Sequence, residues 1–176
     1  AEASVLTSFW TDTTISRKLW EVAEQAGFEG GTIWEPAHGI GNIMSVLPEQ
    51  YQLNSSIVGH EKNSIAARIA KKLYPQNDIV HGVFQDAEVR DNSVDLVITN
   101  VPFSSTAPAG QNTEVKYNLH NYCIAEGLQK LKPGGIMVAI TSASTMEKNP
   151  EQRNQLASLG VLLGAYRLPN NAFESL

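Results

Sequence analysis

Asp95-Leu-Val-Ile-Thr-Asn100-Val-Pro-Phe103 is an apolar run that ends in an amide, a proline and an aromatic ring. Val94, Leu96, Val97, Ile98 and Thr99 strongly prefer β-strands, so the run predicts a buried strand with polar chemistry at its carboxyl end. Combinations of asparagine and proline also mark strand ends for purely structural reasons. A glycine-containing segment about sixty residues earlier in the chain favours a functional site over a plain turn.

The four residues at the end of this strand are the candidate catalytic residues. Asn100 offers an amide oxygen that accepts hydrogen bonds. Pro102 has a fixed φ and no N–H, and it favours an extended backbone at Val101, which lets the Val101 carbonyl point outward. Phe103 offers a face on which a flat ring can stack. Two acceptors beside an aromatic ring suit a planar substrate with an exocyclic amino group, which indicates a nucleobase.

Composition narrows the class of protein. The 176 residues, 42% of them hydrophobic, are enough for one domain with its own core. No apolar run reaches the ~18 residues of a membrane helix and no signal peptide opens the chain, so we expect no membrane partner. The single Cys123 rules out a disulfide framework and favours a cytoplasmic location. The four histidines have no ligand spacing, which predicts no metal site. A protein that holds duplex DNA unaided usually has a basic face, but the net charge here is −5 and only short basic clusters such as Arg68, Lys71 and Lys72 appear.

Strands and helices alternate along the chain. An amphipathic helix is expected at 12–26, with Asp12 or Thr13 as its cap and Gly27 at its end. The other expected elements are strands at 32–35, 57–59, 79–80, 94–99, 136–141 and 161–168, helices at 65–73, 119–131 and from Pro150, and a helical run through Leu47 that Pro48 ends. Residues 104–118 are polar and irregular, as binding loops often are. This alternation predicts a Rossmann-like, doubly wound α/β fold with a mainly parallel sheet.

The first expected strand ends at Glu35 and runs into a loop that contains Gly39 and Gly41. A strand, a glycine loop and a helix open a Rossmann-like unit, although a lone Gly-x-Gly is a weak signal. A dinucleotide site would require a third glycine where Met44 stands, and a bare helix N-terminus for the pyrophosphate. An acid at the strand end suits a cationic ligand without phosphate, and S-adenosylmethionine (SAM) is such a ligand.

Two further acids follow the next two expected strands. Glu61 lies about twenty residues beyond the glycines, where an acid would meet the two ribose hydroxyls of an adenosine. Asp86 follows the third strand, where it could meet an adenine amino group. Each acid alone could be a solvated strand end. Three acids after three successive strands instead predict one adenosine-containing ligand along this edge of the sheet.

These motifs, in this order, resemble those of the amino-methyltransferases that methylate N6 of adenine in DNA. The motifs are Trp10-Thr11, Glu35-Pro-Ala-His-Gly-Ile-Gly41, the acids Glu61 and Asp86, and Asn100-Val-Pro-Phe103. More narrowly, the chain resembles the methylase domain of the large methylase–helicase fusion proteins of phages and plasmids, to which residues 116–122, 133–137 and 167–173 are also similar. The resemblance covers nearly the whole chain.

The resemblance implies direct transfer of a methyl group from SAM to the amino nitrogen of an adenine that is flipped out of DNA. Asn100 and the carbonyl of Val101 would accept hydrogen bonds from that nitrogen, and Phe103 would stack on the base. The residues that it implies for the cofactor are Trp10, Thr11, Glu35, Pro36, Ala37, Gly39, Gly41, Glu61, Lys62, Asp86, Ala87 and Asn100. The implied catalytic residues are Asn100, Val101, Pro102 and Phe103.

Three features depart from the family pattern. His38 stands where many relatives have cysteine or another small residue, and Val101 replaces a commoner proline. The sequence also stops at Leu176, before the antiparallel last strand of this fold and without a target-recognition region. We therefore expect residues 1–176 to be one methyltransferase domain of a longer protein, with helicase or target-recognition segments elsewhere in it.

Other functions remain open at this point. The same Asn-x-Pro-aromatic chemistry serves RNA base methyltransferases and enzymes that methylate glutamine in proteins. The negative charge and the missing target-recognition region also fit a non-catalytic SAM-binding or scaffold module that positions a partner such as a helicase segment. A nicotinamide oxidoreductase is the weakest alternative, because Met44 replaces the third glycine and no proton donor set is visible.

Overall fold

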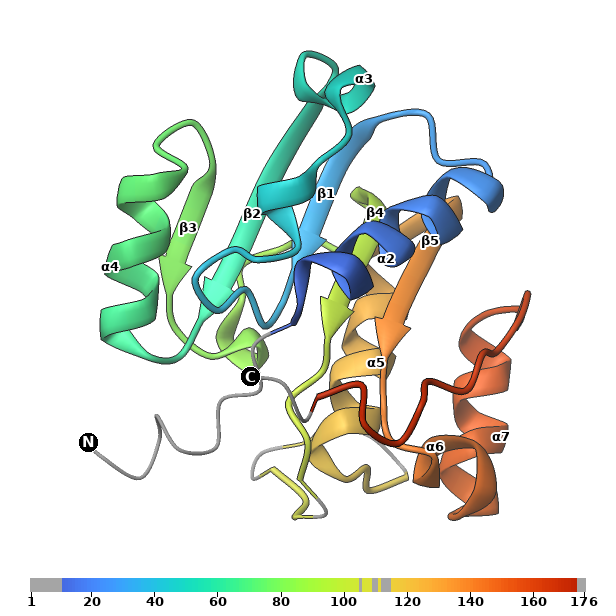
Figure 1. Ribbon diagram of the computed structural model, residues 1–176. Helices are drawn as coiled ribbons and strands as arrows, with labels where there is room; N and C mark the ends of the chain where they lie inside the picture. The colour runs from blue at the N-terminus through green and yellow to red at the C-terminus, as the bar shows by residue number, and fades with distance from the viewer. Residues whose placement is uncertain (1–10, 105, 109–110, 112–114, 174–176) are drawn as a thin grey trace.

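A five-stranded parallel sheet forms the centre of the molecule in the computed structural model, which describes residues 11–104, 106–108, 111 and 115–173 (Figure 1). The strands are β1 (Gly31–Glu35), β2 (Ser55–Glu61), β3 (Asp78–His81), β4 (Val94–Asn100) and β5 (Leu131–Ile140). All four strand pairs are parallel, and the order across the sheet is β3-β2-β1-β4-β5. The predicted doubly wound α/β fold is confirmed.

The strand order reverses between β1 and β4, which lie side by side although β2 and β3 come between them in the chain. In open parallel sheets, ligands bind outside the carboxyl ends of the strands at this kind of reversal. Here those two strands end at Glu35 and Asn100. The topology therefore brings the glycine loop and the Asn-Val-Pro-Phe segment to one place.

Two apolar cores fill the two faces of the sheet. Helix α2 (Thr13–Gln25) covers one face and α5 (Leu119–Lys130) the other, with α7 (Pro150–Leu159) beside α5 (Figure 1). Alternate residues of the buried strands point to opposite faces, so Ile33 belongs to the core under α2 and Trp34 to the core under α5. The remaining short elements are η1 (Met44–Val46), α3 (Glu49–Gln52), η2 (Phe84–Asp86) and α6 (Ser144–Glu147).

The helix boundaries follow the predicted caps. Asp12 precedes α2, and its Oδ1 accepts a hydrogen bond from the Thr14 N–H at 2.7 Å. Gly27 follows the same helix with a φ of +100°, a conformation that side chains disfavour. Pro150 occupies the start of α7 as predicted. Strand β5 begins earlier than predicted, because it includes residues 131–135.

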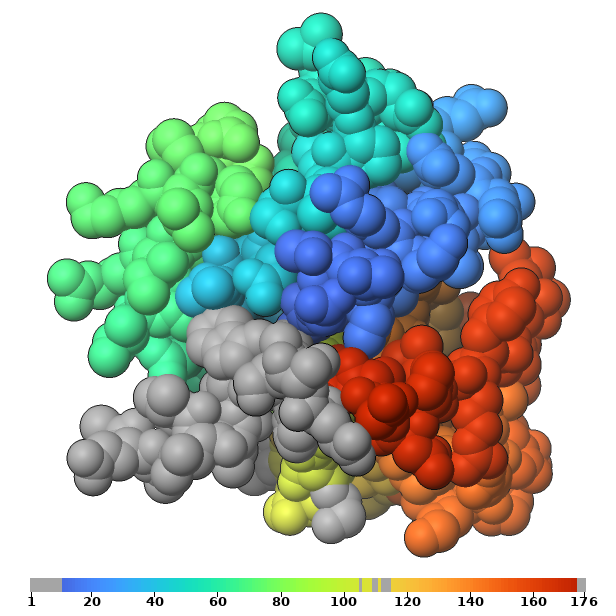
Figure 2. Space-filling view, viewed as in Figure 1, coloured from blue at the N-terminus to red at the C-terminus, as the bar shows by residue number. Residues whose placement is uncertain are grey.

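The predicted strand at 161–168 is wrong. This stretch is irregular and lies on the surface, where Val161 is 86% and Tyr166 80% exposed (red in Figure 2). Strand preference stabilises a strand only when a neighbouring strand satisfies its backbone groups. None of the described strands pairs with this stretch, and β5 remains at the edge of the sheet.

The predicted helical run through Leu47 is also wrong in extent, because only the three residues of η1 are helical there. Pro48 ends this run as predicted, and it also immediately precedes α3. A residue before proline avoids the helical region, and Leu47 accordingly has an extended ψ of 122°.

Helix α4 (Ser64–Leu73) forms as predicted but buries only small side chains. Ala66, Ala67 and Ala70 face the sheet, whereas Ile65 is 60% exposed. None of the helices in the described part of the chain has both the length and the apolarity needed to cross a lipid bilayer.

Candidate functional site

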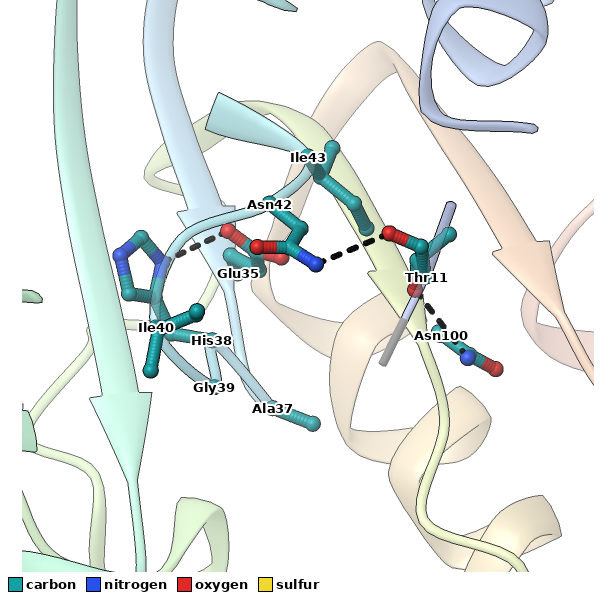
Figure 3. Close-up of a pocket in the computed structure, with 9 residues that line it drawn as sticks. All are labelled: Thr11, Glu35, Ala37, His38, Gly39, Ile40, Asn42, Ile43 and Asn100. Carbon is teal, nitrogen blue, oxygen red and sulfur yellow. Dashed lines mark hydrogen bonds and ion pairs between the residues drawn. The ribbon is translucent and has the colours of Figure 1, made fainter. Parts of the chain in front are cut away.

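A pocket lies at the carboxyl ends of β1 and β4, where the sheet order reverses (Figure 3). Its wall comes from the segment before α2, the end of β1, the glycine loop and the end of β4. The lining residues are Thr11, Glu35, Ala37, His38, Gly39, Ile40, Asn42, Ile43 and Asn100. Five of these were predicted for the cofactor: Thr11, Glu35, Ala37, Gly39 and Asn100.

The glycine loop folds tightly back onto β2. His38 N–H donates to the His60 carbonyl at 2.9 Å, and Gly41 N–H donates to the His38 carbonyl at 2.9 Å. Gly39 and Gly41 have φ angles of +59° and +92°, a region that glycine enters at little cost. A side chain on Gly41 would also collide with the ring of Tyr74. The backbone therefore favours glycine at both positions, and packing adds a second constraint at Gly41.

Glu35 is buried at the end of β1, and its carboxylate forms an ion pair with His38, with 2.6 Å between Oε2 and Nδ1 (Figure 3). Burial raises the pKa of the Glu35 carboxyl above its usual value, and His38 opposes that shift. Burial alone would lower the pKa of the His38 imidazole, but Glu35 and Glu61 raise it above 6.5. The acid predicted for a cationic ligand therefore already has a cationic neighbour within the chain.

Glu61 is hydrogen-bonded to the glycine loop. Its Oε2 accepts a hydrogen bond from the Gly39 N–H at 2.8 Å, and its other oxygen accepts from the Asn63 N–H. The carboxylate is half-buried at the end of β2 and does not line the pocket. Its position beside the loop is compatible with the predicted ribose contact, because a carboxylate oxygen can accept more than one hydrogen bond.

Asn100 is oriented by Thr11. Asn100 Nδ2 donates to Thr11 Oγ1 at 3.2 Å, and Asn42 Nδ2 donates to the Thr11 carbonyl at 3.0 Å (Figure 3). Asn100 Oδ1 is buried and accepts no hydrogen bond from any part of the chain that the structure describes. Buried carbonyl oxygens normally have a partner, so an orphan acceptor beside a pocket indicates a place for a ligand donor.

Val101 and Phe103, which follow Asn100 in the same segment, differ in burial. Val101 is buried, and its N–H donates to the Ile140 carbonyl of β5 at 3.1 Å, which fixes the backbone at this point. Phe103 is 39% exposed, so much of its ring faces solvent rather than the core.

Several predicted site residues do not line this pocket: Pro36, Gly41, Glu61, Lys62, Asp86, Ala87, Val101, Pro102 and Phe103. Asp86 ends η2 and is exposed. Trp10 lies outside the described residues. Lining residues that the sequence reasoning missed are His38, Ile40, Asn42 and Ile43. For Asn42, its place directly after the Gly-x-Gly motif was a usable signal.

Comparison with solved structures identifies the fold family of this chain. The model matches a candidate class I SAM-dependent methyltransferase from Listeria monocytogenes with a TM-score of 0.67 at 18% identity, over 84% of this chain and 50% of that one. A SAM-dependent O-methyltransferase from Thermotoga maritima matches with a TM-score of 0.54 at 15% identity, over 81% and 48% of the two chains. The fold is that of SAM-dependent methyltransferases.

One further solved structure and one protein related in sequence were also found. A geranyl diphosphate methyltransferase solved in complex with SAM has a TM-score of 0.54 at 10% identity, with 81% of this chain and 63% of that one covered. In sequence, the chain is 27% identical over 178 residues to the defense against restriction protein B of Escherichia phage P1. That match covers 97% of this chain but only 8% of the phage protein, and no family model matches the chain.

Proposed function

We propose that this chain binds SAM in the pocket between β1 and β4 and transfers its methyl group to N6 of adenine in DNA. The observation that carries the proposal is the buried Asn100 Oδ1, which has no donor among the described residues and lies on the same pocket as Gly39. A planar amino group would supply that missing donor. The same pocket would hold the methyl donor within reach of the amine.

The pocket suits SAM better than a dinucleotide. Glu35 is buried in the pocket wall, where its carboxylate would repel a pyrophosphate and attract a cation when His38 beside it is neutral. Met44, which stands where the third dinucleotide glycine would be, is buried in the core under α2. The fold shared with the SAM-dependent methyltransferases above supports the same choice.

The residues of β4 would activate the amine. When bound, SAM supplies a methyl group that the amino nitrogen takes as the carbon–sulfur bond breaks, with the bonding electrons left on sulfur. Asn100 Oδ1 and the Val101 carbonyl would accept hydrogen bonds from the nitrogen, which pulls its lone pair out of the ring and stabilises the developing positive charge. A group of this kind contributes about 3 kcal/mol to a transition state. The proton of the methylated amine then passes to water.

DNA is the proposed substrate on two grounds. The name of the phage relative concerns restriction, which acts on DNA, and the order of motifs resembles that of adenine-N6 methyltransferases. The chain itself has a net charge of −5 and spans only 8% of that relative. Target-recognition or helicase segments of a longer protein would then supply the contacts to the DNA backbone.

Methyl transfer from isotopically labelled SAM tests the proposal. Equal amounts of DNA, RNA and bacterial protein would be incubated with the chain, and nucleosides and peptides would be analysed by mass spectrometry. Label at N6-methyladenine from DNA is the expected result. Label only in RNA or on protein glutamine would retain the methyltransferase and replace the substrate.

A non-catalytic SAM-binding module is the second candidate, favoured by the acidic net charge of the chain. Calorimetry separates the two. Micromolar SAM binding together with methyl transfer supports the enzyme, whereas binding without transfer to any of the three substrates supports the module. No SAM binding at all would contradict both and favour a scaffold that positions a partner without the cofactor.

A further inference from the structure

His38 occupies a slot that two glycines leave open. A Cβ built on Gly59 of β2 would lie 2.8 Å from Cγ and Nδ1 of His38, and one on Gly41 would lie 3.0 Å from its Nε2. The ring of Tyr74 packs edge-on against the imidazole, with 6.2 Å between ring centroids. The imidazole is therefore held rigidly, and it is one of the most buried polar side chains in the described chain.

The two ring nitrogens of His38 have different environments. Nδ1 lies 2.6 Å from Glu35 Oε2, so the charge of the carboxylate stabilises a proton on this nitrogen, although the two atoms are not aligned as a hydrogen bond. Nε2 is buried and has no hydrogen-bond partner among the described residues. A buried N–H without an acceptor is costly, whereas a bare ring nitrogen is less so. The proton on Nε2 is therefore the one that His38 loses more readily.

The charges that face His38 come from two strands. Glu35 belongs to β1 and Glu61 to β2, and both carboxylates favour the charged imidazole, while Tyr74 after α4 is a neutral phenol at ordinary pH. Glu35 and imidazolium together are neutral. Glu35 would therefore attract a second cation only weakly while His38 is charged. The attraction becomes strong when His38 is neutral.

We propose that His38 is a positioning residue that couples a proton to cofactor binding: when the positive charge of SAM enters beside Glu35, His38 releases its Nε2 proton to solvent. The inference rests on the proposed function, because it takes SAM as the ligand. His38 keeps its Nδ1–H toward Glu35 throughout, so the carboxylate stays oriented while its charge becomes available to the ligand. The charge of Glu35 is thus compensated by protonated His38 in the free chain and by SAM in the complex.

This coupling has a direct thermodynamic consequence. Where His38 is charged in the free chain, SAM binding would strengthen by up to about tenfold per pH unit as the pH rises. S-adenosylhomocysteine lacks the sulfonium charge, so its binding would release less of a proton and depend less on pH. Discrimination between the methyl donor and the spent product would then increase with pH.

Calorimetry in buffers of different ionisation enthalpy measures the proton directly. We expect release of close to one proton per SAM bound at about pH 6, and a smaller release for S-adenosylhomocysteine. His38→Asn keeps an N–H donor toward Glu35 but cannot titrate, so it should bind SAM with no proton release. His81→Asn, which replaces an exposed histidine, is the matched control and should release the same proton as the unchanged chain.

Each outcome bears on the inference. Equal proton release in the chain with and without His38 would overturn it, and so would SAM binding without release in the unchanged chain. If His38→Asn fails to fold, an NMR titration of the His38 ring in the unchanged chain serves instead. The pKa of the ring should fall when SAM is added, and an unaltered pKa would overturn the inference. Absence of any SAM binding would show that the proposed function has failed, and the inference with it.

Discussion

Asn100 Nδ2 donates to Thr11 Oγ1 at 3.2 Å, although 89 residues separate the two positions in the chain. This contact engages one end of the Asn100 amide. The nitrogen is engaged by Thr11, and the oxygen is left buried beside the pocket. An acceptor in that place could receive a hydrogen bond from an amino group of a ligand.

Replacement of Asn100 by alanine should separate chemistry from cofactor binding. Asn100→Ala removes the acceptor for the amine but leaves Glu35 and the glycine loop in place. We expect the SAM dissociation constant to change little and the methyl-transfer rate to fall by about 10²–10³. Calorimetry and single-turnover kinetics measure the two quantities, and a variant that methylates at the normal rate would remove Asn100 from the mechanism.

Thr11→Val should act through Asn100. Valine keeps the shape of threonine but lacks the oxygen that accepts from Asn100 Nδ2. Loss of a hydrogen bond of ~1 kcal/mol predicts a fall in rate of about fivefold. The double variant with Asn100→Ala should be no slower than Asn100→Ala alone, because the same interaction is already lost. Additive losses would mean that Thr11 acts independently.

Phe103 should contribute to substrate binding rather than to stability. The ring is 39% exposed, so Phe103→Ala should change the free energy of unfolding only slightly. Loss of base stacking, on the order of 1–3 kcal/mol, should instead raise the KM for DNA by about 5-fold to 150-fold. Phe103→Trp retains an aromatic face and should be mild. A similar KM for the alanine and tryptophan variants would argue against stacking.

Gly59→Ala should destabilise the fold through His38. The added Cβ would lie 2.8 Å from the imidazole and 2.9 Å from Ile79 Cδ1, and such overpacking costs about 1–3 kcal/mol. Gly82→Ala is the matched control, because its Cβ would approach only Val80 Cγ1, at 3.9 Å. Urea denaturation compares the two variants, and equal stabilities would show that the slot around His38 can relax.

Acid should weaken the fold through His60. Trp34 Nε1 donates to His60 Nδ1 at 3.0 Å, which requires a neutral imidazole, and burial lowers the pKa of His60 below 6.5. The unfolded chain therefore binds this proton first. Stability from His60 is present above about pH 6.5 and is lost as the pH falls through the lowered pKa. Denaturation between about pH 5 and pH 7 measures the slope.

Trp34→Phe provides the comparison for this pH dependence. It removes the donor to His60 Nδ1 while keeping an aromatic ring in the core. The slope of stability against pH should become smaller, because protonation of His60 then breaks no hydrogen bond. An unchanged slope would assign the acid sensitivity to burial of the His60 ring rather than to its hydrogen bond, or to another group such as His120, whose pKa burial also lowers.

Helices and strands were predicted well where the signal lies within the segment itself. Asp12 and Gly27 mark the ends of α2, and the apolar run before Asn100 forms β4. The parallel topology then follows from alternation of strands and helices. This was enough to bring Asn100 and Gly39 to the same pocket.

Features that depend on distant partners could not be read from the sequence. The pairing of His38 with Glu35 needs the room left by Gly59, which lies on another strand. Helix α4 shows a regular apolar pattern, yet its buried side chains are those of Ala66, Ala67 and Ala70, and Ile65 is left outside. Residues 161–168 have strand-forming composition, but strand formation requires a neighbour with free backbone groups.

The exposed stretch at 161–168 has a practical consequence for anyone who prepares residues 1–176. Val161, Leu162, Leu163 and Tyr166 present apolar surface to water next to one another. Two molecules that meet through such surface release ordered water, so self-association should grow with protein concentration. Light scattering at rising concentration should detect this, and Leu163→Lys should suppress it.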